Sequence, residues 1–506
     1  MLFKFLKKSS FAGLIMLLAF SCKKDLGNYE YINLNEPTAF VGLNDTTAFF
    51  GKRFVMKPEV LFSKDILKSD TSRYSYEWSY AGPNGLGGSA LYRISNARYL
   101  DINMSLAAGT YPFYYAVTDN ESGVKYRKEF IITVVNQINE GWLLLSEVNG
   151  TARLDMLSKS TTGTFDVIND LLGTTVSGLT LQGKPKFLYT YNTGANTGVG
   201  INLSYGIYVG TDASTNRLDP ETFKWLPGYN VKFEILDDLP ANFTADLVRQ
   251  SGSTRSYLVG NHNAYIYERV TNVKYSVPIN IIAGQLSGFR IAPFVANNYT
   301  SSTAAAILYD IDNKRFVKHT GTNSTSSIIP DPSGKLFSYT TGLDLLYMTW
   351  VPFNGGEVFS ILKDPVNAKR YLARFNPISN AQSYYAEILA TDFANAEQYA
   401  VSPTLGYVFY SVGAKVYEYD MSTKVTKLML DKGTEKVSLI KFNEFLNSTK
   451  YTDGTKLIVC SYDPLKPEGT NGKMELYTVP TIQGDLVLTN SYSGFGKVQS
   501  INYRER

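Results

Sequence analysis

Lys456-Leu457-Ile458-Val459-Cys460-Ser461, followed after a turn by Lys473-Met474-Glu475-Leu476-Tyr477, is the clearest copy of a pattern that fills most of this chain. The first stretch is a short apolar run and the second alternates polar and apolar residues, which is typical of neighbouring strands. Apolar runs of this kind begin at seven positions, and successive starts lie 64, 50, 48, 53, 49 and 50 residues apart. The runs are residues 142–145, 206–209, 256–259, 304–308, 357–360, 406–409 and 456–459.

A period near 50 residues, with several strands in each copy, is typical of the blades of a β-propeller. A single small twisted sheet cannot bury both of its faces, and a closed ring of such sheets can. Residues 141–506 are therefore predicted to form a seven-bladed propeller with each apolar run in an inner strand, closed by a strand at 497–503. A ring of six or eight blades stays open because the first interval is long. Two or three further sandwich domains are the competing interpretation.

Residues 29–137 are predicted to form a separate antiparallel sandwich. Tyr74-Ser75-Tyr76-Glu77-Trp78 alternates with Trp78 inward, and residues 108–119 (AGTYPFYYAVTD) and 128–135 (KEFIITVV) supply further strands. These three stretches resemble a PKD domain, an immunoglobulin-like sandwich, and such modules act as spacers or docking surfaces. With 37 Tyr, 28 Phe and 40 Gly, the chain is predicted to be all-β. Beyond the first 21 residues, helical periodicity is limited to residues 392–398.

Residues 1–21 have the pattern of a signal peptide. Three lysines precede the ten-residue apolar run 11–20 (FAGLIMLLAF), which is too short to span a bilayer. The Ala-Phe-Ser-Cys sequence that ends at Cys22 resembles the lipobox of bacterial lipoproteins, which implies cleavage before Cys22 and acylation of its thiol. Residues 22–28 then form a lipidated tether. The alternative is an ordinary secretory signal with an incidental cysteine.

The chain as a whole resembles the PKD-like lipoprotein family of Bacteroidota. The resemblance rests on Cys22, on the stretch Lys24-Asp25-Leu26-Gly27-Asn28-Tyr29, on one PKD-like module and on the long β-rich region. It implies an outer-membrane lipoprotein, facing the cell surface, that accompanies a SusC/SusD-like importer of oligosaccharides or peptides. Surface lipoproteins of that phylum often carry acidic residues directly after the cysteine, whereas this chain has Lys23 and Lys24 there. The resemblance therefore implies lipidation more firmly than surface display.

Charge and chemistry exclude several classes of function. Removing the three lysines of residues 1–21 lowers the formal charge from +4 to +1, and without a basic stripe nucleic-acid binding has no electrostatic support. Only two histidines occur: His262 looks like a hairpin-turn residue, and His319 ends a polar strand. Cys460, in an apolar run, is predicted to be a buried, inert thiol. We therefore expect no catalytic residues, no metal, no cofactor and no enzyme activity.

One acidic stretch needs separate mention. Asp310-Ile311-Asp312-Asn313 has oxygen-bearing side chains at alternate positions, as a calcium-binding loop has. A hairpin turn explains the same residues, and the turn is the favoured interpretation.

Binding is the favoured class of function, because loops on a rigid scaffold commonly carry recognition. The candidate ligand-binding residues are Trp225 and Tyr229 in one Pro/Gly-containing stretch, and Trp350 and Phe353 in another, because exposed rings stack on sugars or on peptide side chains. The leading hypothesis is an accessory ligand-binding subunit of the importer. A purely structural docking subunit and a propeller hydrolase acting on glycan or peptide are the alternatives.

Overall fold

The structure is a computed structural model and describes residues 34–65, 71–84, 87–106, 108–135, 137–160, 163–192, 205–269, 271 and 273–506. The predicted signal peptide, Cys22 and the tether lie outside these residues. The chain divides into two compact units, residues 1–135 and 136–506. Strands dominate the described residues, which confirms the all-β class. Among these residues, every helix is too short or too polar to cross a bilayer.

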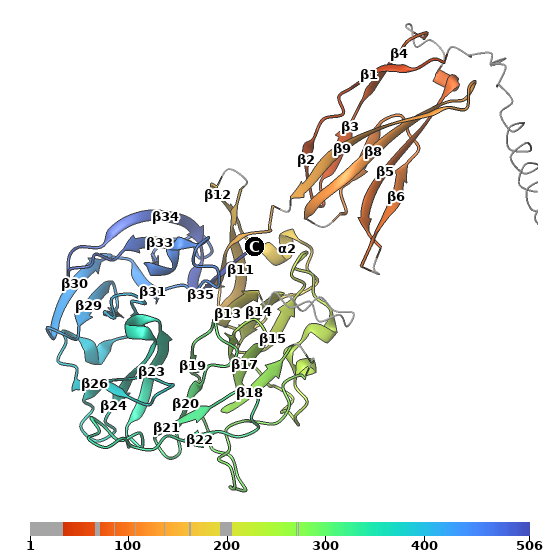
Figure 1. Ribbon diagram of the computed structural model, residues 1–506. Helices are drawn as coiled ribbons and strands as arrows, with labels where there is room; N and C mark the ends of the chain where they lie inside the picture. The colour runs from red at the N-terminus through yellow and green to blue at the C-terminus, as the bar shows by residue number, and fades with distance from the viewer. Residues whose placement is uncertain are drawn as a thin grey trace, which may run out of the picture. The chain divides into compact units, whose positions relative to one another are not determined.

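The first unit has nine strands among its described residues, arranged in three sheets (Figure 1). The main sheet has the order β2-β9-β8-β5-β6, with β2 parallel to β9 and the other pairs antiparallel. The pairs β1-β4 and β3-β7 form the two smaller sheets. The strands are β1 (Pro37–Val41), β2 (Thr46–Phe49), β3 (Arg53–Met56), β4 (Glu59–Phe62), β5 (Tyr74–Pro83), β6 (Ser89–Ser95), β7 (Leu100–Asn103), β8 (Gly109–Asp119) and β9 (Lys125–Val135).

Trp78 lies at the centre of the core of this unit. Its side chain is fully buried, its ring packs against Tyr115 and Phe130 with centroids 4.4 Å and 6.3 Å away, and its Nε1 donates to the Ala97 carbonyl at 2.9 Å. The alternation along β5 therefore turns Trp78 inward, as predicted. Its indole N–H keeps a hydrogen-bond partner, which a buried Trp needs.

Among its described residues, the second unit has seven antiparallel sheets of three or four strands, numbered here in chain order. The first is β12-β11-β10-β35, the second β13-β14-β15 and the third β16-β17-β18, and the fourth to seventh are β19–β22, β23–β26, β27–β30 and β31–β34. Strands of the first three sheets are β10 (Gly141–Val148), β11 (Thr151–Lys159), β12 (Phe165–Ile168), β13 (Pro185–Asn192), β14 (Tyr205–Thr211), β15 (Thr215–Leu218), β16 (Ala245–Ser251), β17 (Arg255–Gly260), β18 (Asn263–Glu268) and β35 (Lys497–Arg504). Those of the other four are β19 (Ala296–Asn297), β20 (Ala306–Asp310), β21 (Arg315–His319), β22 (Ser327–Ile328), β23 (Asp344–Val351), β24 (Glu357–Lys363), β25 (Arg370–Phe375), β26 (Gln382–Glu387), β27 (Gln398–Val401), β28 (Val408–Val412), β29 (Lys415–Asp420), β30 (Val425–Asp431), β31 (Lys436–Lys441), β32 (Lys456–Tyr462), β33 (Gly472–Thr478) and β34 (Val487–Phe495).

These sheets follow one another around a ring (Figure 1). Their first strands lie at the inner side, where β13 lies against β16, β23 against β27 and β27 against β31. β35 pairs with β10 from Gly141↔Arg504 to Glu147↔Lys497, and it also lies against β13 and β31. The first sheet therefore joins strands from both ends of the unit and completes the ring of sheets.

The seven apolar runs lie in or overlap the second strand of each sheet from the inner side: β10, β14, β17, β20, β24, β28 and β32. The prediction that these runs form the strands nearest the ring's centre is therefore wrong, because each run lies one strand farther out. The second strand has a neighbour on each edge and a sheet on each face, so every residue of β14 and β20 is buried. The innermost strand has one edge toward the ring's centre and keeps more polar residues.

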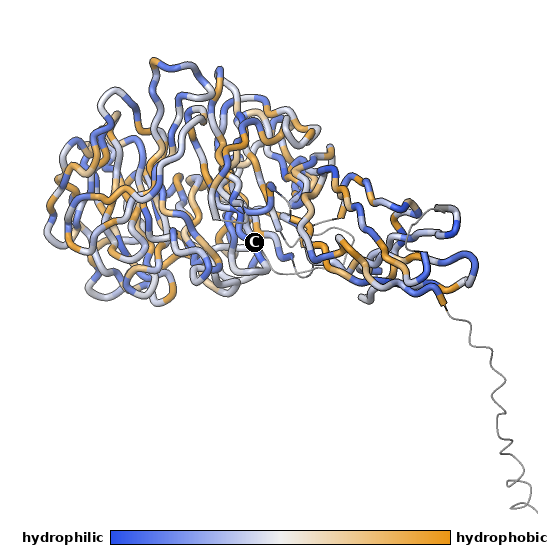
Figure 2. Tube along the Cα trace, turned by 90° about the horizontal axis from the view of Figure 1, so that it is seen from above, coloured by the Kyte–Doolittle hydropathy of each residue, from blue (hydrophilic) through white to orange (hydrophobic). Residues whose placement is uncertain are grey.

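Helical structure among the described residues is limited to single turns. The α-helix α2 (Leu171–Thr174) begins after Asp170, whose carboxylate accepts from the Gly173 N–H at 3.2 Å. The expected helical stretch at 392–398 is not an α-helix. It contains a 3₁₀ turn and then the start of β27, and Asp392, just before the turn, has a left-handed φ of 54°. The 3₁₀ turns are η1 (Thr71–Arg73), η2 (Pro227–Tyr229), η3 (Val231–Glu234), η4 (Phe353–Gly355), η5 (Phe393–Asn395) and η6 (Thr452–Thr455). Figure 2 shows apolar and polar residues interleaved along the whole trace, as strands buried on one face require.

Candidate functional site

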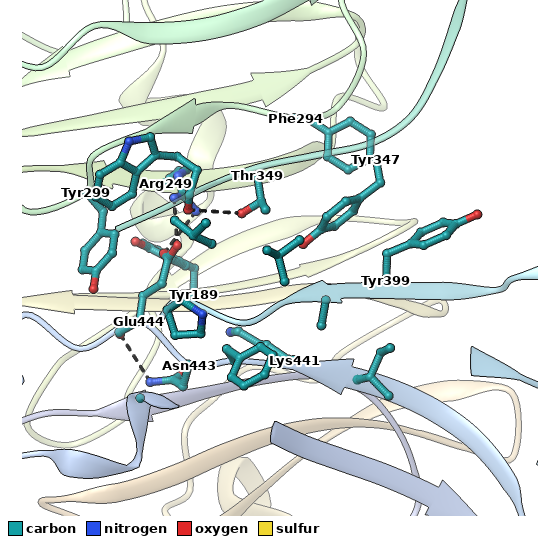
Figure 3. Close-up of a pocket in the computed structure, with 18 of the residues that line it drawn as sticks. Tyr189, Arg249, Phe294, Tyr299, Tyr347, Thr349, Tyr399, Lys441, Asn443 and Glu444 are labelled. Carbon is teal, nitrogen blue, oxygen red and sulfur yellow. Dashed lines mark hydrogen bonds and ion pairs between the residues drawn. The ribbon is translucent and has the colours of Figure 1, made fainter. Parts of the chain in front are cut away.

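The inner strands of the ring enclose a cavity of about 560 Å³. Its walls come from β13, β16, β23, β27 and β31, from the segment around β19, and from Ser500 of β35. Figure 3 shows side chains from these strands converging on this space. The volume lies within the range of ~300–1,000 Å³ that is usual for small-molecule sites. The centre of the ring is therefore the candidate functional site.

Aromatic side chains form much of the cavity wall. Tyr189, Tyr299, Tyr347 and Tyr399 are each half-buried there. The rings of Tyr347 and Tyr399 lie 5.7 Å apart, and Phe294 meets Tyr347 edge-on at 6.0 Å. Burial raises the pKa of Tyr347 to about 12, so its hydroxyl stays protonated at neutral pH. The wall thus presents flat apolar rings with polar hydroxyl groups.

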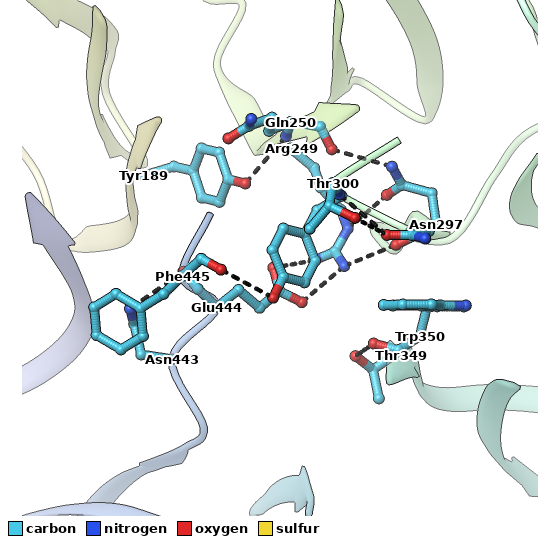
Figure 4. A network of polar contacts seen from close by, with 12 residues as sticks. Tyr189, Arg249, Gln250, Asn297, Thr300, Thr349, Trp350, Asn443, Glu444 and Phe445 are labelled. Carbon is cyan, nitrogen blue, oxygen red and sulfur yellow. Dashed lines mark hydrogen bonds and ion pairs between the residues drawn. The ribbon is translucent and has the colours of Figure 1, made fainter. Parts of the chain in front are cut away.

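An ion pair reaches across the ring. Arg249 of β16, in the third sheet, contacts Glu444 just after β31 of the seventh, with Nη2–Oε1 at 2.8 Å and Nη1–Oε2 at 3.1 Å (Figure 4). Arg249 also donates Nε to the Asn297 Oδ1 at 2.7 Å. Burial disfavours the charged guanidinium, but Glu444 more than offsets this and holds the pKa of Arg249 above its ordinary value. The two charges neutralise each other within the cavity.

The segment that carries Glu444 runs between β31 and β32 and is held from two sides. The Tyr299 hydroxyl donates to the Phe445 carbonyl at 3.4 Å (Figure 4). On the other side, the Glu505 carboxylate accepts from the N–H groups of Leu446 at 2.8 Å and Asn447 at 3.0 Å. The segment therefore places Glu444 and its neighbours firmly against the ring's interior.

Lys441 and Asn443 retain unused hydrogen-bonding capacity. The Lys441 ammonium donates to the Ile501 carbonyl at 2.7 Å. Burial lowers the pKa of Lys441 to about 8, while Glu444 favours its charged form and Arg249 opposes it. Asn443 is only 3% exposed; its Nδ2 donates to the Glu444 carbonyl at 3.3 Å, and its Oδ1 has no hydrogen-bond partner among the described residues. Both residues line the cavity (Figure 3).

The predicted binding residues Trp350 and Phe353 are separated by the structure. Trp350 lies in β23 rather than in a loop, is 7% exposed, lines the cavity and meets Tyr299 edge-on at 6.2 Å. Phe353 lies in η4 and does not line the cavity. Its ring packs under the Arg374 guanidinium at 5.0 Å and against Phe359 at 6.1 Å. Trp350 is therefore the one predicted residue that lies at the central cavity.

Trp225 and Tyr229 lie together beside the second sheet, away from the cavity lining. The Trp225 Nε1 donates to the Asn216 Oδ1 at 3.0 Å. The Arg217 guanidinium lies 4.8 Å from the centre of the Tyr229 ring. Both aromatic side chains are half-buried in local packing.

The two histidines have structural surroundings. His262 has a left-handed φ of 61° in the turn between β17 and β18, which confirms its predicted place in a hairpin turn. His319 ends β21 as predicted and is fully buried, with Nδ1 2.9 Å from the Tyr257 hydroxyl and Nε2 2.7 Å from the Asn323 carbonyl. Burial lowers the pKa of His319. Cys460 is fully buried, as predicted, and burial raises the pKa of its thiol.

The acidic stretch at 310–313 forms the hairpin turn between β20 and β21. The fully buried Asp310 carboxylate accepts from the N–H groups of Asp312 at 3.1 Å and Asn313 at 2.9 Å, and from the Arg315 Nε at 2.8 Å. These contacts confirm the turn interpretation. Within the part of the chain that the structure describes, His, Cys, Asp and Glu form no group of three or more that could hold a metal ion.

Sequence reasoning missed Arg249, Lys441, Asn443 and Glu444. Arg249 and Glu444 are 195 residues apart, and they meet only because the ring brings the third and seventh sheets around one centre. The one available signal was positional, because in six of the seven sheets the strand that precedes the apolar run lies at the centre. Polar residues there, such as Lys441 at the end of β31, are candidates on that ground alone.

Part of the chain matches a known protein family. Residues 22–185 match the PKD-like family, a match that includes the described strands of the first unit and β10 to β12 of the second. The match spans less than half of the chain. No curated protein matches the sequence.

Solved structures give distant likenesses. A quinonprotein alcohol dehydrogenase-like protein from Bacteroides thetaiotaomicron has a TM-score of 0.41 at 11% identity, covering 91% of this chain and 97% of that one. A candidate 6-phosphogluconolactonase from Bacteroides uniformis has a TM-score of 0.42 at 11% identity, covering 72% and 99%. A protein of unknown function from Bacteroides caccae has a TM-score of 0.30 at 8% identity, covering 72% and 100%.

Proposed function

We propose that residues 136–506 form a seven-bladed β-propeller whose central cavity binds an oligosaccharide, in an exported lipoprotein that assists a nutrient importer. The fold part is supported by the seven sheets around one centre and by the pairing of β35 with β10. The binding part is carried by one observation. The cavity joins half-buried aromatic rings to a small number of convergent polar groups.

The chemistry of that wall suits a sugar. The apolar C–H face of a pyranose ring packs on flat aromatic side chains, and its hydroxyl groups need hydrogen-bond partners around the rim. Tyr347 and Tyr399 supply such rings, and Asn443 and Lys441 supply unused acceptor and donor capacity. A peptide side chain would use the rings but would leave more of these polar groups unpaired, which is costly in a buried site.

We propose binding without turnover. Hydrolysis of a glycosidic bond commonly uses two carboxyl groups on either side of the bond. Glu444 is the single carboxylate among the lining residues of the cavity, and Arg249 engages both of its oxygens. An enzyme would leave at least one carboxylate available to the substrate.

Anchoring and partnership are the remaining parts of the proposal. The lipobox-like sequence ending at Cys22 supports a lipid anchor in the outer membrane. The resemblance to PKD-like lipoproteins of Bacteroidota suggests a SusC/SusD-like importer as the partner. Co-anchoring in one membrane raises the effective concentration of the two partners, so even a weak contact would keep them together.

The test of binding is an oligosaccharide array probed with the full chain purified in detergent. Tyr347→Ala should weaken binding of any captured glycan about tenfold or more, because a stacking surface is lost. Tyr229→Ala is the matched control, since Tyr229 is also a half-buried tyrosine but lies away from the cavity. Equal effects of the two changes, or capture of peptides but no glycan, would contradict the proposal.

The test of partnership is co-purification from native outer membranes. Wild-type protein should recover a SusC/SusD-like pair, whereas Cys22→Ala should leave the membrane fraction or keep its signal peptide uncleaved. If no such pair is recovered and the purified protein degrades a glycan or a peptide, the hydrolase alternative replaces the binding proposal.

A further inference from the structure

The cavity carries an uncompensated positive charge. Its lining residues include three charged side chains, Arg249, Glu444 and Lys441. Arg249 and Glu444 pair with each other through two contacts of 2.8 Å and 3.1 Å. Lys441 is left with the backbone carbonyl of Ile501 as its hydrogen-bond acceptor, and it makes no ion pair within the described part of the chain. The cavity therefore has a net charge of one positive unit when Lys441 is protonated.

An ammonium group has three donors, and Lys441 uses one of them on the Ile501 carbonyl. A buried charge without a partner is costly, and here the cost is visible as a lowered pKa of about 8. Glu444 already faces Arg249, so it compensates Lys441 only partly. An anionic group entering the cavity would satisfy the two unused donors and restore the charge balance.

Asn443 lies two residues after Lys441, and both line the same cavity. Its Oδ1 is buried without a hydrogen-bond partner among the described residues, although its Nδ2 is used. An unpaired buried acceptor calls for a donor, which a sugar hydroxyl supplies. Lys441 and Asn443 thus line the same cavity as Tyr347 of β23 and Tyr399 of β27, the strand beside β31 (Figure 3).

We infer that the cavity is specific for an acidic oligosaccharide, whose uronate carboxylate binds Lys441 while a neighbouring hydroxyl donates to Asn443 and a sugar ring packs on Tyr347 and Tyr399. This inference rests on the proposed function and names its ligand class. A carboxylate fits better than a sulfate, because a sulfate ester presents three acceptor oxygens and the cavity offers a single unpaired cation. Neutral oligosaccharides lack the anion that Lys441 requires.

The experiment compares matched pairs of uronate oligomers and their neutral hexose counterparts, using isothermal titration of the full chain in detergent. The wild-type protein should bind one acidic member at least about tenfold more tightly than its neutral counterpart. Lys441→Met should abolish this preference, because it should weaken binding of the acidic member at least about tenfold more than binding of its neutral counterpart. Lys436→Met is the matched control, because Lys436 is exposed, lies in the same strand and does not line the cavity.

A second measurement needs no variant and covers the case that Lys441→Met fails to fold. The bound uronate oligomer should protect Lys441 from reductive methylation, as read by mass spectrometry, while Lys436 stays reactive. Equal affinity for acidic and neutral members, tighter binding of sulfated oligomers, or no protection of Lys441 would overturn the inference and leave oligosaccharide binding standing. Failure to bind any member of any pair would overturn both.

Discussion

Glu418 provides a sharp test of how burial controls the stability of the second unit. This residue lies in β29, the third strand of the sixth sheet, and its side chain is fully buried. Neither carboxylate oxygen has a hydrogen-bond partner with good geometry among the described residues, although Gln483 is near enough to lower the pKa slightly. Burial dominates, and it raises the pKa of Glu418 from 4.5 to about 7.

The sign of the effect follows from proton binding. The folded state holds the Glu418 proton more tightly than the unfolded state, so stability falls as pH rises from about 4.5 to 7. The rise in the pKa of Glu418 from 4.5 to about 7 lowers the free energy of unfolding by at most about 3 kcal/mol above pH 7. Glu418→Gln removes the charge and keeps the shape, so it should stabilise the unit by up to that amount at pH 8 and hardly at all at pH 4.

The assay is calorimetric unfolding of wild type and Glu418→Gln at pH 4 and pH 8. The matched control is Glu357→Gln, because Glu357 is also buried in an inner part of a sheet but accepts from the Arg374 Nε at 2.9 Å. This control should destabilise at pH 8 by about 3 kcal/mol, because Arg374 loses its counter-charge. If Glu418→Gln is neutral at pH 8, or destabilises more there than at pH 4, the reasoning from burial is refuted.

Arg249→Met should lower the free energy of unfolding by about 3 kcal/mol, because Glu444 is left without its partner. The double change Arg249→Met with Glu444→Gln should lower it by less than the sum of the two single changes. Additive losses, measured by urea unfolding, would contradict the ion pair. Ile501→Asp places a carboxylate at a fully buried position of β35, so it should abolish cooperative unfolding of the second unit, and an unchanged transition would show that β35 does not complete the ring. Trp78→Ala should destabilise the first unit by about 4 kcal/mol, measured by its calorimetric transition, and a loss below about 1 kcal/mol would refute the central place of Trp78 in that core.

The repeat could be found from sequence because its cause is local. The second strand of each sheet is covered on both faces, which favours a largely apolar run such as residues 142–145 or 206–209. The shift of one strand position came from equating the most apolar strand with the innermost one. The innermost strands line the central cavity, and they keep residues such as Tyr347 and Thr349 that a fully packed core would not select.

The site could be predicted only in part. Trp350 was found because it stands close in sequence to Pro352 and Gly355, a pattern that predicts a loop-borne aromatic residue, although the structure places it in β23. Trp225 satisfied the same pattern and packs locally instead, so composition alone does not separate a wall residue from a packed one. Lys441 and Asn443 carry no motif, since their significance depends on which partners they lack. That property exists only after folding.

The joining of both ends of the second unit in one sheet has a mechanical consequence. β10 is flanked by β11 and β35, and the Arg504 and Arg506 side chains bond to the carbonyls of Ile138 and Asn139 just ahead of β10. A force applied at residue 137 therefore acts on this sheet in shear. The seven residue pairs that join β10 to β35 would have to break together. The cavity draws its walls mainly from the other six sheets, so tension applied at residue 137 would bypass the cavity.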